Sequence, residues 1–190
     1  MSYVDETAVV HADATLGEGV KVWHFCHVMA GARIGAGTVL GQNVMVAPNV
    51  SIGQSCKIQN NVSVYAGVTL EDDVFCGPSC VFTNVSTPRA FVNRKAEFGR
   101  IRVCKGATIG ANATIVCPKP GETLTLGAYS FVAAGAVVTR DVAPYALVKG
   151  TPARAAGWVS KAGEVLGHDL VCPRTGERYG LNAGQLQRVE

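Results

Sequence analysis

The sequence predicts an all-β protein in which short strands follow one another around a coil and are separated by tight corners. Apolar side chains recur at every sixth position from residue 4 to residue 82, whereas a helix would require spacings of three and four. Of the 190 residues, 48% are hydrophobic but only 7% are aromatic. A narrow interior filled by Val, Ile, Leu and Ala explains this combination, because such an interior has no room for many aromatic rings.

Each predicted strand places one large and one small side chain inside the coil. The large inward positions are Val4, Val10, Leu16, Val22, Val28, Ile34, Leu40, Val46, Ile52, Ile58, Val64, Leu70, Cys76 and Phe82. The residue four positions after each of these is small or β-branched, and the residue three positions after is often Gly, Asn or Asp. These last residue types tolerate positive φ, which tight corners require.

Two insertions interrupt the repeat, and both fall at the same corner of a three-sided coil. After Phe82 the next inward apolar residue comes fifteen positions late, so residues 83–102 are expected to leave the coil as a long loop. After Ile115 it comes five positions late, which predicts a short loop around residues 117–123. Because Phe82 and Ile115 occupy the same side of the coil, the two loops are expected to start from one corner, one turn apart.

The long loop combines an exceptional position with concentrated positive charge. Its cations are Arg89, Arg94, Lys95, Arg100 and Arg102, against the single anion Glu97. Loops that leave a regular scaffold commonly carry function, and this charge suits an anionic ligand. The short loop holds Lys119. The sequence is equally compatible with a ligand-binding role for this loop and with a solvated connection that has no such role.

Composition excludes several other classes of protein. The formal net charge of +3 is too small to favour nucleic acid as a partner. No uncharged apolar run is long enough to span a membrane, and the N-terminus has no basic region followed by an apolar stretch. A cytoplasmic protein without membrane insertion is therefore expected.

The cysteines and histidines do not indicate a metal site. Three of the seven cysteines, Cys26, Cys56 and Cys80, occupy the small inward position, where a free thiol packs like a small hydrophobic side chain. No Cys-x-x-Cys pair exists, and the histidines are not spaced for a three-His zinc site. Either His24 or His27 could still serve as a catalytic base.

Near the end of the repeat, the segment from Tyr145 to Arg154 reads Tyr-Ala-Leu-Val-Lys-Gly-Thr-Pro-Ala-Arg. It resembles the segment that closes the coil in hexapeptide-repeat acyltransferases and lies against coenzyme A. The resemblance implies a left-handed parallel β-helix over residues 1–154 and acetyl-CoA as co-substrate, with no metal. The cofactor-binding residues that it implies are Ala134, Gly135, Lys149, Gly150, Pro152 and Arg154.

Longer segments resemble one branch of that family, the nucleotide-sugar N-acetyltransferases. They are the heptapeptide VWHFCHV at 22–28, KIQNNVSVY at 57–65, and VFTNV at 81–85, which leads into Pro-Arg-Ala at 88–90. The branch acetylates the 3-amino group of UDP-2-acetamido-3-amino-2,3-dideoxy-D-glucuronate, for the 2,3-diacetamido uronic acids of bacterial O-antigen and other surface polysaccharide. Acetylation of a different amino sugar or an amino-acid hydroxyl, and a non-enzymatic scaffold, remain as alternatives.

For that reaction Asn84 is the first catalytic candidate, because it stands where the long loop leaves the coil. Its amide can orient the amine or donate to an oxyanion, but it cannot act as a base. The base is either His27, a water molecule or the departing thiolate of coenzyme A. The anionic sugar nucleotide is expected to bind Arg89, Arg94, Lys95 and Lys119, and the family resemblance implies a homotrimer with active sites between subunits.

The last segment, residues 155–190, loses the sixfold pattern. The stretches GWVSKAGEVL and LVCPRTGERYGL resemble the two halves of a zinc-ribbon tail. Only Cys172 remains of the expected ligands, because Ser160, Gly163 and Thr175 occupy the other three positions. A small metal-free hairpin or loop that packs on the coil is therefore expected.

Overall fold

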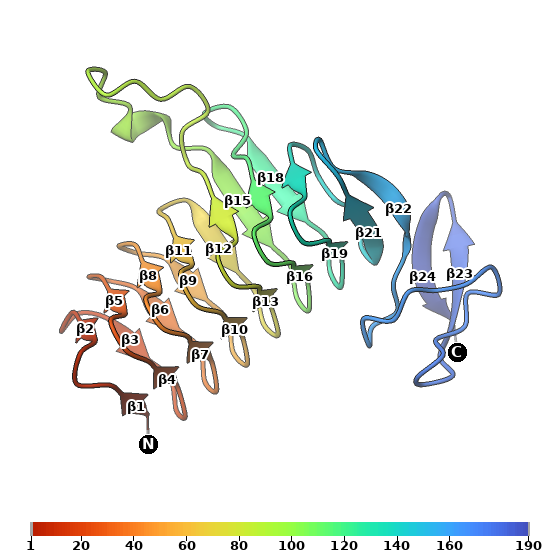
Figure 1. Ribbon diagram of the computed structural model, residues 1–190, viewed down its shortest axis with the longest axis horizontal. Helices are drawn as coiled ribbons and strands as arrows, with labels where there is room; N and C mark the ends of the chain where they lie inside the picture. Colours follow the sequence, from red (N-terminus) through yellow and green to blue (C-terminus); the bar gives the residue numbers. More distant parts are fainter. Residues whose placement is uncertain (1, 190) are drawn as a thin grey trace.

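The computed structural model describes residues 2–189 as a left-handed parallel β-helix followed by a short C-terminal extension (Figure 1). Three parallel sheets form the sides of the coil. The first contains β1 (Tyr3–Val4), β4 (Lys21–Val22), β7 (Val39–Leu40), β10 (Lys57–Ile58), β13 (Phe75–Cys76), β16 (Thr108–Ile109), β19 (Phe131–Val132), β21 (Ala146–Lys149) and the antiparallel β22 (Arg154–Trp158). The second contains β2 (Val9–Val10), β5 (His27–Val28), β8 (Met45–Val46), β11 (Ser63–Val64), β14 (Val81–Phe82), β17 (Thr114–Ile115) and β20 (Val137–Val138). The third contains β3 (Thr15–Leu16), β6 (Arg33–Ile34), β9 (Ser51–Ile52), β12 (Val68–Leu70), β15 (Arg100–Val103) and β18 (Thr123–Leu126).

The predicted fold class is confirmed, and the sixfold pattern is what produces it. Strands one turn apart pair in register, as Val10 does with Val28 and Val4 with Val22. The large inward side chains of the middle turns are fully buried, among them Leu40 and Val64 at 0% exposure. Corner residues adopt positive φ where the sequence offers Asn or Gly, for example 59° at Asn43.

Both loops leave the coil at the corner between the second and third sheets, as predicted. The long loop connects β14 to β15, and the short loop connects β17 to β18 one turn later. Figure 1 shows the long loop, drawn in yellow-green, projecting away from the coil. It contains one short 3₁₀ helix, η1 (Lys95–Glu97).

The predicted end of the long loop is wrong, because the loop ends at Gly99 and not at residue 102. Residues 100–103 form β15, in which Ile101 pairs with Val68 of the previous turn. Ile101 and Val103 point inward with 1% and 0% exposure, while Arg100 and Arg102 point outward. Counting in sixes located only Val103, whereas the strand alternation of period two already begins at Ile101.

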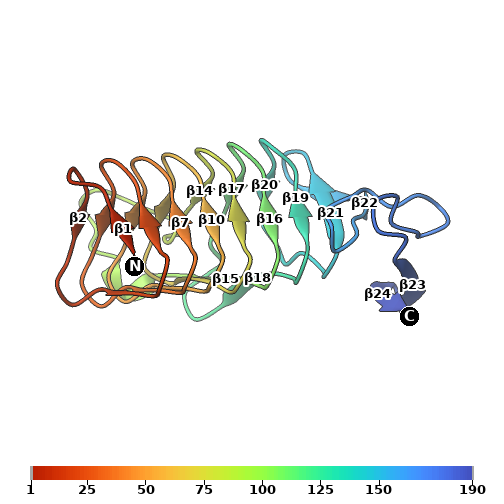
Figure 2. The same cartoon turned by 90° about the horizontal axis from the view of Figure 1, so that it is seen from below.

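The two ends of the coil differ. At the N-terminal end Val4 is 42% exposed, although the equivalent Val22 one turn later is 0% exposed. At the other end β22 pairs antiparallel with β21. It begins at Arg154, the residue at which the sequence predicts the end of the coil. Beyond it, β23 (Arg178–Asn182) and β24 (Gln185–Val189) form the hairpin at the far end in Figure 2.

The extension has a small core of its own, formed by Leu166, Cys172, Tyr179 and Leu186. Tyr129 and Tyr145 stack at 5.3 Å between ring centroids, and Tyr145 meets Tyr179 edge-on at 5.6 Å. These three rings connect the last turns of the coil to the extension. Within residues 2–189, no helix has the length and apolar character needed to cross a membrane.

Candidate functional site

Hydrogen bonds hold the two loops where they leave the coil, and they fix the position of the first residues of the long loop. The backbone N–H of Gly99 donates to the carbonyl of Asn84 at 2.9 Å. This hydrogen bond closes the long loop where it leaves the coil, and we call the junction of Asn84 and Gly99 the neck of the loop. The N–H of Cys117 in the short loop donates to Thr83 Oγ1, also at 2.9 Å. A side chain at Gly99 would place its Cβ 2.5 Å from the carbonyl oxygen of Pro118, so only glycine allows the loops to approach this closely.

The Asn84 side chain lies at this neck and is half-buried. Its backbone is held by Gly99, whereas its carboxamide makes no hydrogen bond with any residue of 2–189. A carboxamide offers two donors and one acceptor, and those of Asn84 are available to a ligand. The predicted catalytic residue is therefore in a fixed position with unused hydrogen-bonding capacity.

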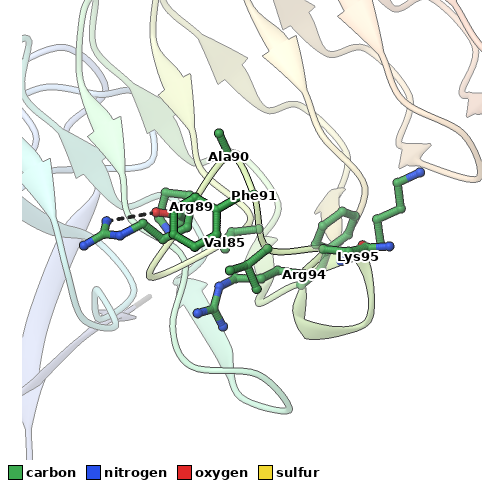
Figure 3. A pocket seen from close by; sticks show the side chains of 10 residues that line it. Val85, Arg89, Ala90, Phe91, Arg94 and Lys95 are labelled. Carbon is green, nitrogen blue, oxygen red and sulfur yellow. Dashed lines mark hydrogen bonds between the residues drawn. The ribbon is translucent and has the colours of Figure 1, made fainter.

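Beyond the neck, the long loop folds around a cavity of about 490 Å³ (Figure 3). Apolar walls come from Val85, Pro88, Phe91, Val92 and Phe98, and cationic groups come from Arg89, Arg94 and Lys95. Figure 3 shows the side chains of Arg89 and Lys95 pointing to opposite sides of the cavity. Three of the four predicted substrate-binding residues thus surround one cavity, while Lys119 is exposed on the short loop and is not among its lining residues.

The three cations of the cavity are not equivalent. Arg94 Nη1 forms an ion pair with Glu97 Oε2 at 2.7 Å across η1, and its Nε is buried without a hydrogen-bond partner in the described chain. Arg89 donates from Nη1 to the carbonyl of its neighbour Pro88 at 3.2 Å. Of the loop cations counted from the sequence, Arg102 lies on β15 and is paired with Glu71 at 2.6 Å, which raises the pKa of Arg102.

His27 and Asn84, the two predicted catalytic residues, are not brought together within one chain. His27 is exposed on β5, and β8 and β11 separate β5 from β14, which precedes Asn84. Three strand spacings of about 4.8 Å correspond to about 14 Å along the coil axis. No single amine could contact both side chains of one chain at that separation.

His24 has a partner that the sequence did not reveal. Its Nε2 lies 3.2 Å from Oδ2 of Asp5, a carboxylate with only 8% exposure. The side chain and the backbone N–H of Thr7 donate to Asp5, and these bonds lower the pKa of the carboxyl. The Asp-x-Thr spacing at residues 5–7, typical of an Asx turn, is the signal that could have identified the carboxylate.

The residues predicted to bind coenzyme A gather at the C-terminal end of the coil. Ala134 and Gly135 form the corner after β19, and Gly150 lies at the same corner one turn later, where its carbonyl accepts a hydrogen bond from Val137 at 3.0 Å. Lys149 and Arg154 face each other across β21 and β22, and Pro152 lies in the turn between these strands.

A second cavity, of about 470 Å³, adjoins these strands. Arg154 lines it together with Arg140 and Trp158, two residues that lie outside the predicted cofactor set. The signal for Arg140 was present, because this cation stands two residues after β20, the last regular strand of the repeat.

The degenerate zinc-ribbon positions also meet in space. Cys172 Sγ lies 3.2 Å from Ser160 Oγ, and the thiol is 1% exposed. Burial raises the pKa of Cys172, but hydrogen bonds from Ser160, Thr175 and the backbone outweigh it and lower the pKa to about 7. Hydroxyl and N–H groups thus surround the one sulfur atom where a zinc ribbon has four ligands.

Comparison with known proteins identifies the repeat. Residues 13–48 match the model of the bacterial transferase hexapeptide (six repeats), and residues 31–66 match that of the hexapeptide repeat of succinyl-transferase. A dTDP-3-amino-3,6-dideoxy-alpha-D-galactopyranose 3-N-acetyltransferase from Aneurinibacillus thermoaerophilus is 41% identical over 96 residues, covering 49% of this chain and 47% of that protein. The chain spans about half the length of the curated relatives it matches.

Two solved structures share the coil. A hexapeptide-repeat acetyltransferase from Vibrio cholerae, complexed with acetyl coenzyme A, is 28% identical with a TM-score of 0.55, covering 68% of this chain and 72% of that one. PerB from Caulobacter crescentus, in complex with CoA and GDP-perosamine, is 25% identical with a TM-score of 0.50, covering 82% of this chain and 57% of that one. Residues 13–66 of this chain are therefore similar to the hexapeptide repeats of bacterial transferases.

Proposed function

We propose that this hexapeptide-repeat chain transfers the acetyl group of acetyl-CoA to the amino group of a nucleotide-linked sugar. The observation that carries the proposal is the neck of the long loop. There Asn84, whose carboxamide has no hydrogen-bond partner within residues 2–189, directly precedes Val85, which lines a cavity together with three cations. The 41% identity with a dTDP-amino-sugar 3-N-acetyltransferase over half of this chain supports the same chemistry.

The substrate that fits the cavity is an anion. A sugar nucleotide carries a diphosphate, and Arg and Lys side chains are the groups that bind phosphate oxygens. We infer UDP-2-acetamido-3-amino-2,3-dideoxy-D-glucuronate as the substrate, whose carboxylate adds a further negative charge. Its product would enter the synthesis of 2,3-diacetamido uronic acids for bacterial surface polysaccharide such as O-antigen.

In this mechanism the neutral amine of the sugar attacks the thioester carbonyl of acetyl-CoA. A C–N bond forms and the C–S bond breaks, and the amine loses one proton while the departing sulfur leaves as a thiolate. Asn84 orients the amine or donates to the tetrahedral oxyanion. The proton passes to a water molecule, to the coenzyme A thiolate itself, or to His27 of a neighbouring copy.

Acetyl-CoA is proposed to lie along the last turns of the coil, at Ala134, Gly135, Lys149, Gly150, Pro152 and Arg154. Lys149 and Arg154 are cross-strand neighbours, so their two charges can act on the same phosphate group. A homotrimer with active sites between subunits belongs to this proposal. In such an assembly, the neck of one copy can meet a histidine of another.

The test is thiol release from acetyl-CoA, followed with DTNB, in the presence of UDP-amino sugars, other amino sugars and serine. Release only with a nucleotide-linked amino sugar is the expected result. Release with serine would favour the hydroxyl-acetylating alternative. Absence of release with every acceptor, from a folded chain that binds acetyl-CoA, would contradict the proposal.

A further inference from the structure

The aromatic side chain at the loop cavity is unusually free. Phe91 lines the cavity and is 87% exposed. Phe98, which directly follows η1, lines the same cavity but is half-buried. An apolar ring exposed to this degree gains nothing from the fold of its own chain, since a ring contributes to stability mainly by being buried. The ring is available to stack on a planar group that enters the cavity.

The charges beside Phe91 indicate what that group is attached to. Arg89, Arg94 and Lys95 line the same cavity, and no carboxylate of residues 2–189 is among its lining residues. Figure 3 shows the guanidinium groups of Arg89 and Arg94 on one side of Phe91 and the Lys95 amine on the other. A cavity that presents an aromatic ring and two guanidinium groups complements a base joined to phosphates.

The state of Arg94 supports a ligand with acceptor oxygens. Its Nη1 is used by Glu97, whereas its buried Nε–H has no acceptor within the described chain. A buried donor without an acceptor is costly, and a phosphate oxygen of a bound ligand would relieve that cost. The ion pair with Glu97 meanwhile holds the guanidinium in place, so Arg94 is already positioned before the ligand arrives.

The cavity of about 490 Å³ is in the range of small-molecule sites. We propose that it is the nucleoside diphosphate subsite, in which Phe91 stacks on the nucleobase and Arg89 and Arg94 bind the diphosphate. The inference rests on the proposed function and deepens it, because it divides the substrate into a nucleotide held by the loop and a sugar presented to Asn84 at the neck. Lys95, on the opposite side, has no part in the diphosphate contact.

The test uses the full chain, with UDP, uridine and inorganic pyrophosphate as probes in calorimetric titrations without acetyl-CoA. UDP is expected to bind more tightly than either half alone. Phe91→Ala should weaken UDP and uridine alike, by about 5- to 100-fold for a lost base–aromatic stack, and Phe91→Trp should restore binding. Arg89→Ala should weaken UDP and pyrophosphate but leave uridine unchanged.

Phe25→Ala is the matched control, since Phe25 is 59% exposed on a different corner of the coil and should leave UDP affinity unchanged. In turnover, Phe91→Ala should raise the KM for the nucleotide sugar while kcat and the KM for acetyl-CoA stay unchanged. Unchanged melting temperatures would confirm that the variants are folded.

Equal UDP affinity in the wild type and Phe91→Ala would overturn the inference, as would the absence of UDP binding by the wild type. A change of molecular mass by light scattering with unchanged UDP affinity would also overturn it, and would assign Phe91 to contact with a second copy. If UDP binding follows the expected pattern but no amino sugar is acetylated, the subsite stands and the proposed function fails.

Discussion

The coil and the long loop belong to one chain, yet different interactions hold them. Inward side chains from successive turns of the coil pack on one another and are buried, as Leu40 and Ile58 are at 0% and 1% exposure. In residues 83–99 only Gly99 is buried, and the loop is held by backbone hydrogen bonds at its neck and by the Arg94–Glu97 pair.

This difference separates stability from binding. Burial of apolar side chains stabilises the coil, so its inward positions have little freedom to change without loss of folding. The loop contributes little to that core, and its aromatic and cationic side chains are free to contact a ligand. Substitutions in the two regions should therefore affect different measurements.

The largest expected effect is a loss of folding stability in Leu40→Ala, for which Phe91→Ala is the comparison. Leu40→Ala leaves a cavity in the coil and should lower the free energy of unfolding by about 2–5 kcal/mol. Phe91→Ala removes a larger but exposed side chain and should change it by less than about 0.5 kcal/mol. Urea denaturation followed by circular dichroism measures both, and equal losses would contradict the contrast between coil and loop.

The next effect concerns turnover at the neck. Asn84→Ala should lower kcat by about 10- to 1000-fold, the range for lost positioning or one lost oxyanion donor, with little change in the melting temperature. Steady-state thiol release measures the change. Asn84→Asp is a useful companion, because the isosteric carboxylate keeps the shape but cannot donate to an oxyanion.

His27→Ala is the control for this assignment. If His27→Ala abolishes activity while Asn84→Ala leaves it intact, His27 is the base and the role given to Asn84 is wrong. If both are inactive, mixing the two variants distinguishes the cases. Recovery of activity in mixed oligomers would show that the two residues act from different copies.

A smaller effect is expected at the far end of the coil. Arg154→Ala should raise the KM for acetyl-CoA by about 10- to 100-fold, as expected for one lost charged hydrogen bond, and should change the KM for the sugar less. Arg33→Ala, on the outer face of β6, is the control. Equal increases in the two KM values would remove Arg154 from the cofactor site.

The smallest effect is a pH dependence in the extension. The pKa of Cys172 is lowered from the ordinary 9.0 to about 7, so the thiolate is favoured in the folded state. This contribution to stability is fully present above pH 9, decreases as pH falls towards 7 and is lost below it. The melting temperature of the wild type relative to Cys172→Ser should therefore rise between pH 7 and pH 9, and a constant difference would contradict it.

The coil and the common corner of its two loops could be predicted from the sequence, because every turn repeats the same local requirement for inward apolar residues and a corner. Asn84 was selected because it stands where the long loop leaves the coil, and the C-terminal cofactor segment was selected from a family resemblance, so both assignments stay predictions. The start of the strand Arg100–Val103 was not predicted, because an insertion interrupts the sixfold spacing of the inward residues. Only the pairing of this strand with β12 shows where the coil resumes.

The contacts that give the site its chemistry were decided only by the tertiary structure. The separation of His27 from Asn84, the pairing of Asp5 with His24 and the close approach of Gly99 to Pro118 each join residues whose distance depends on how turns stack. Phe91 and Arg94 line one cavity because of the irregular fold of the loop. The loop has no sequence repeat from which the direction of a side chain could be predicted. A repeating sequence therefore determines a repeating backbone, while a ligand site depends on the places where the repetition stops.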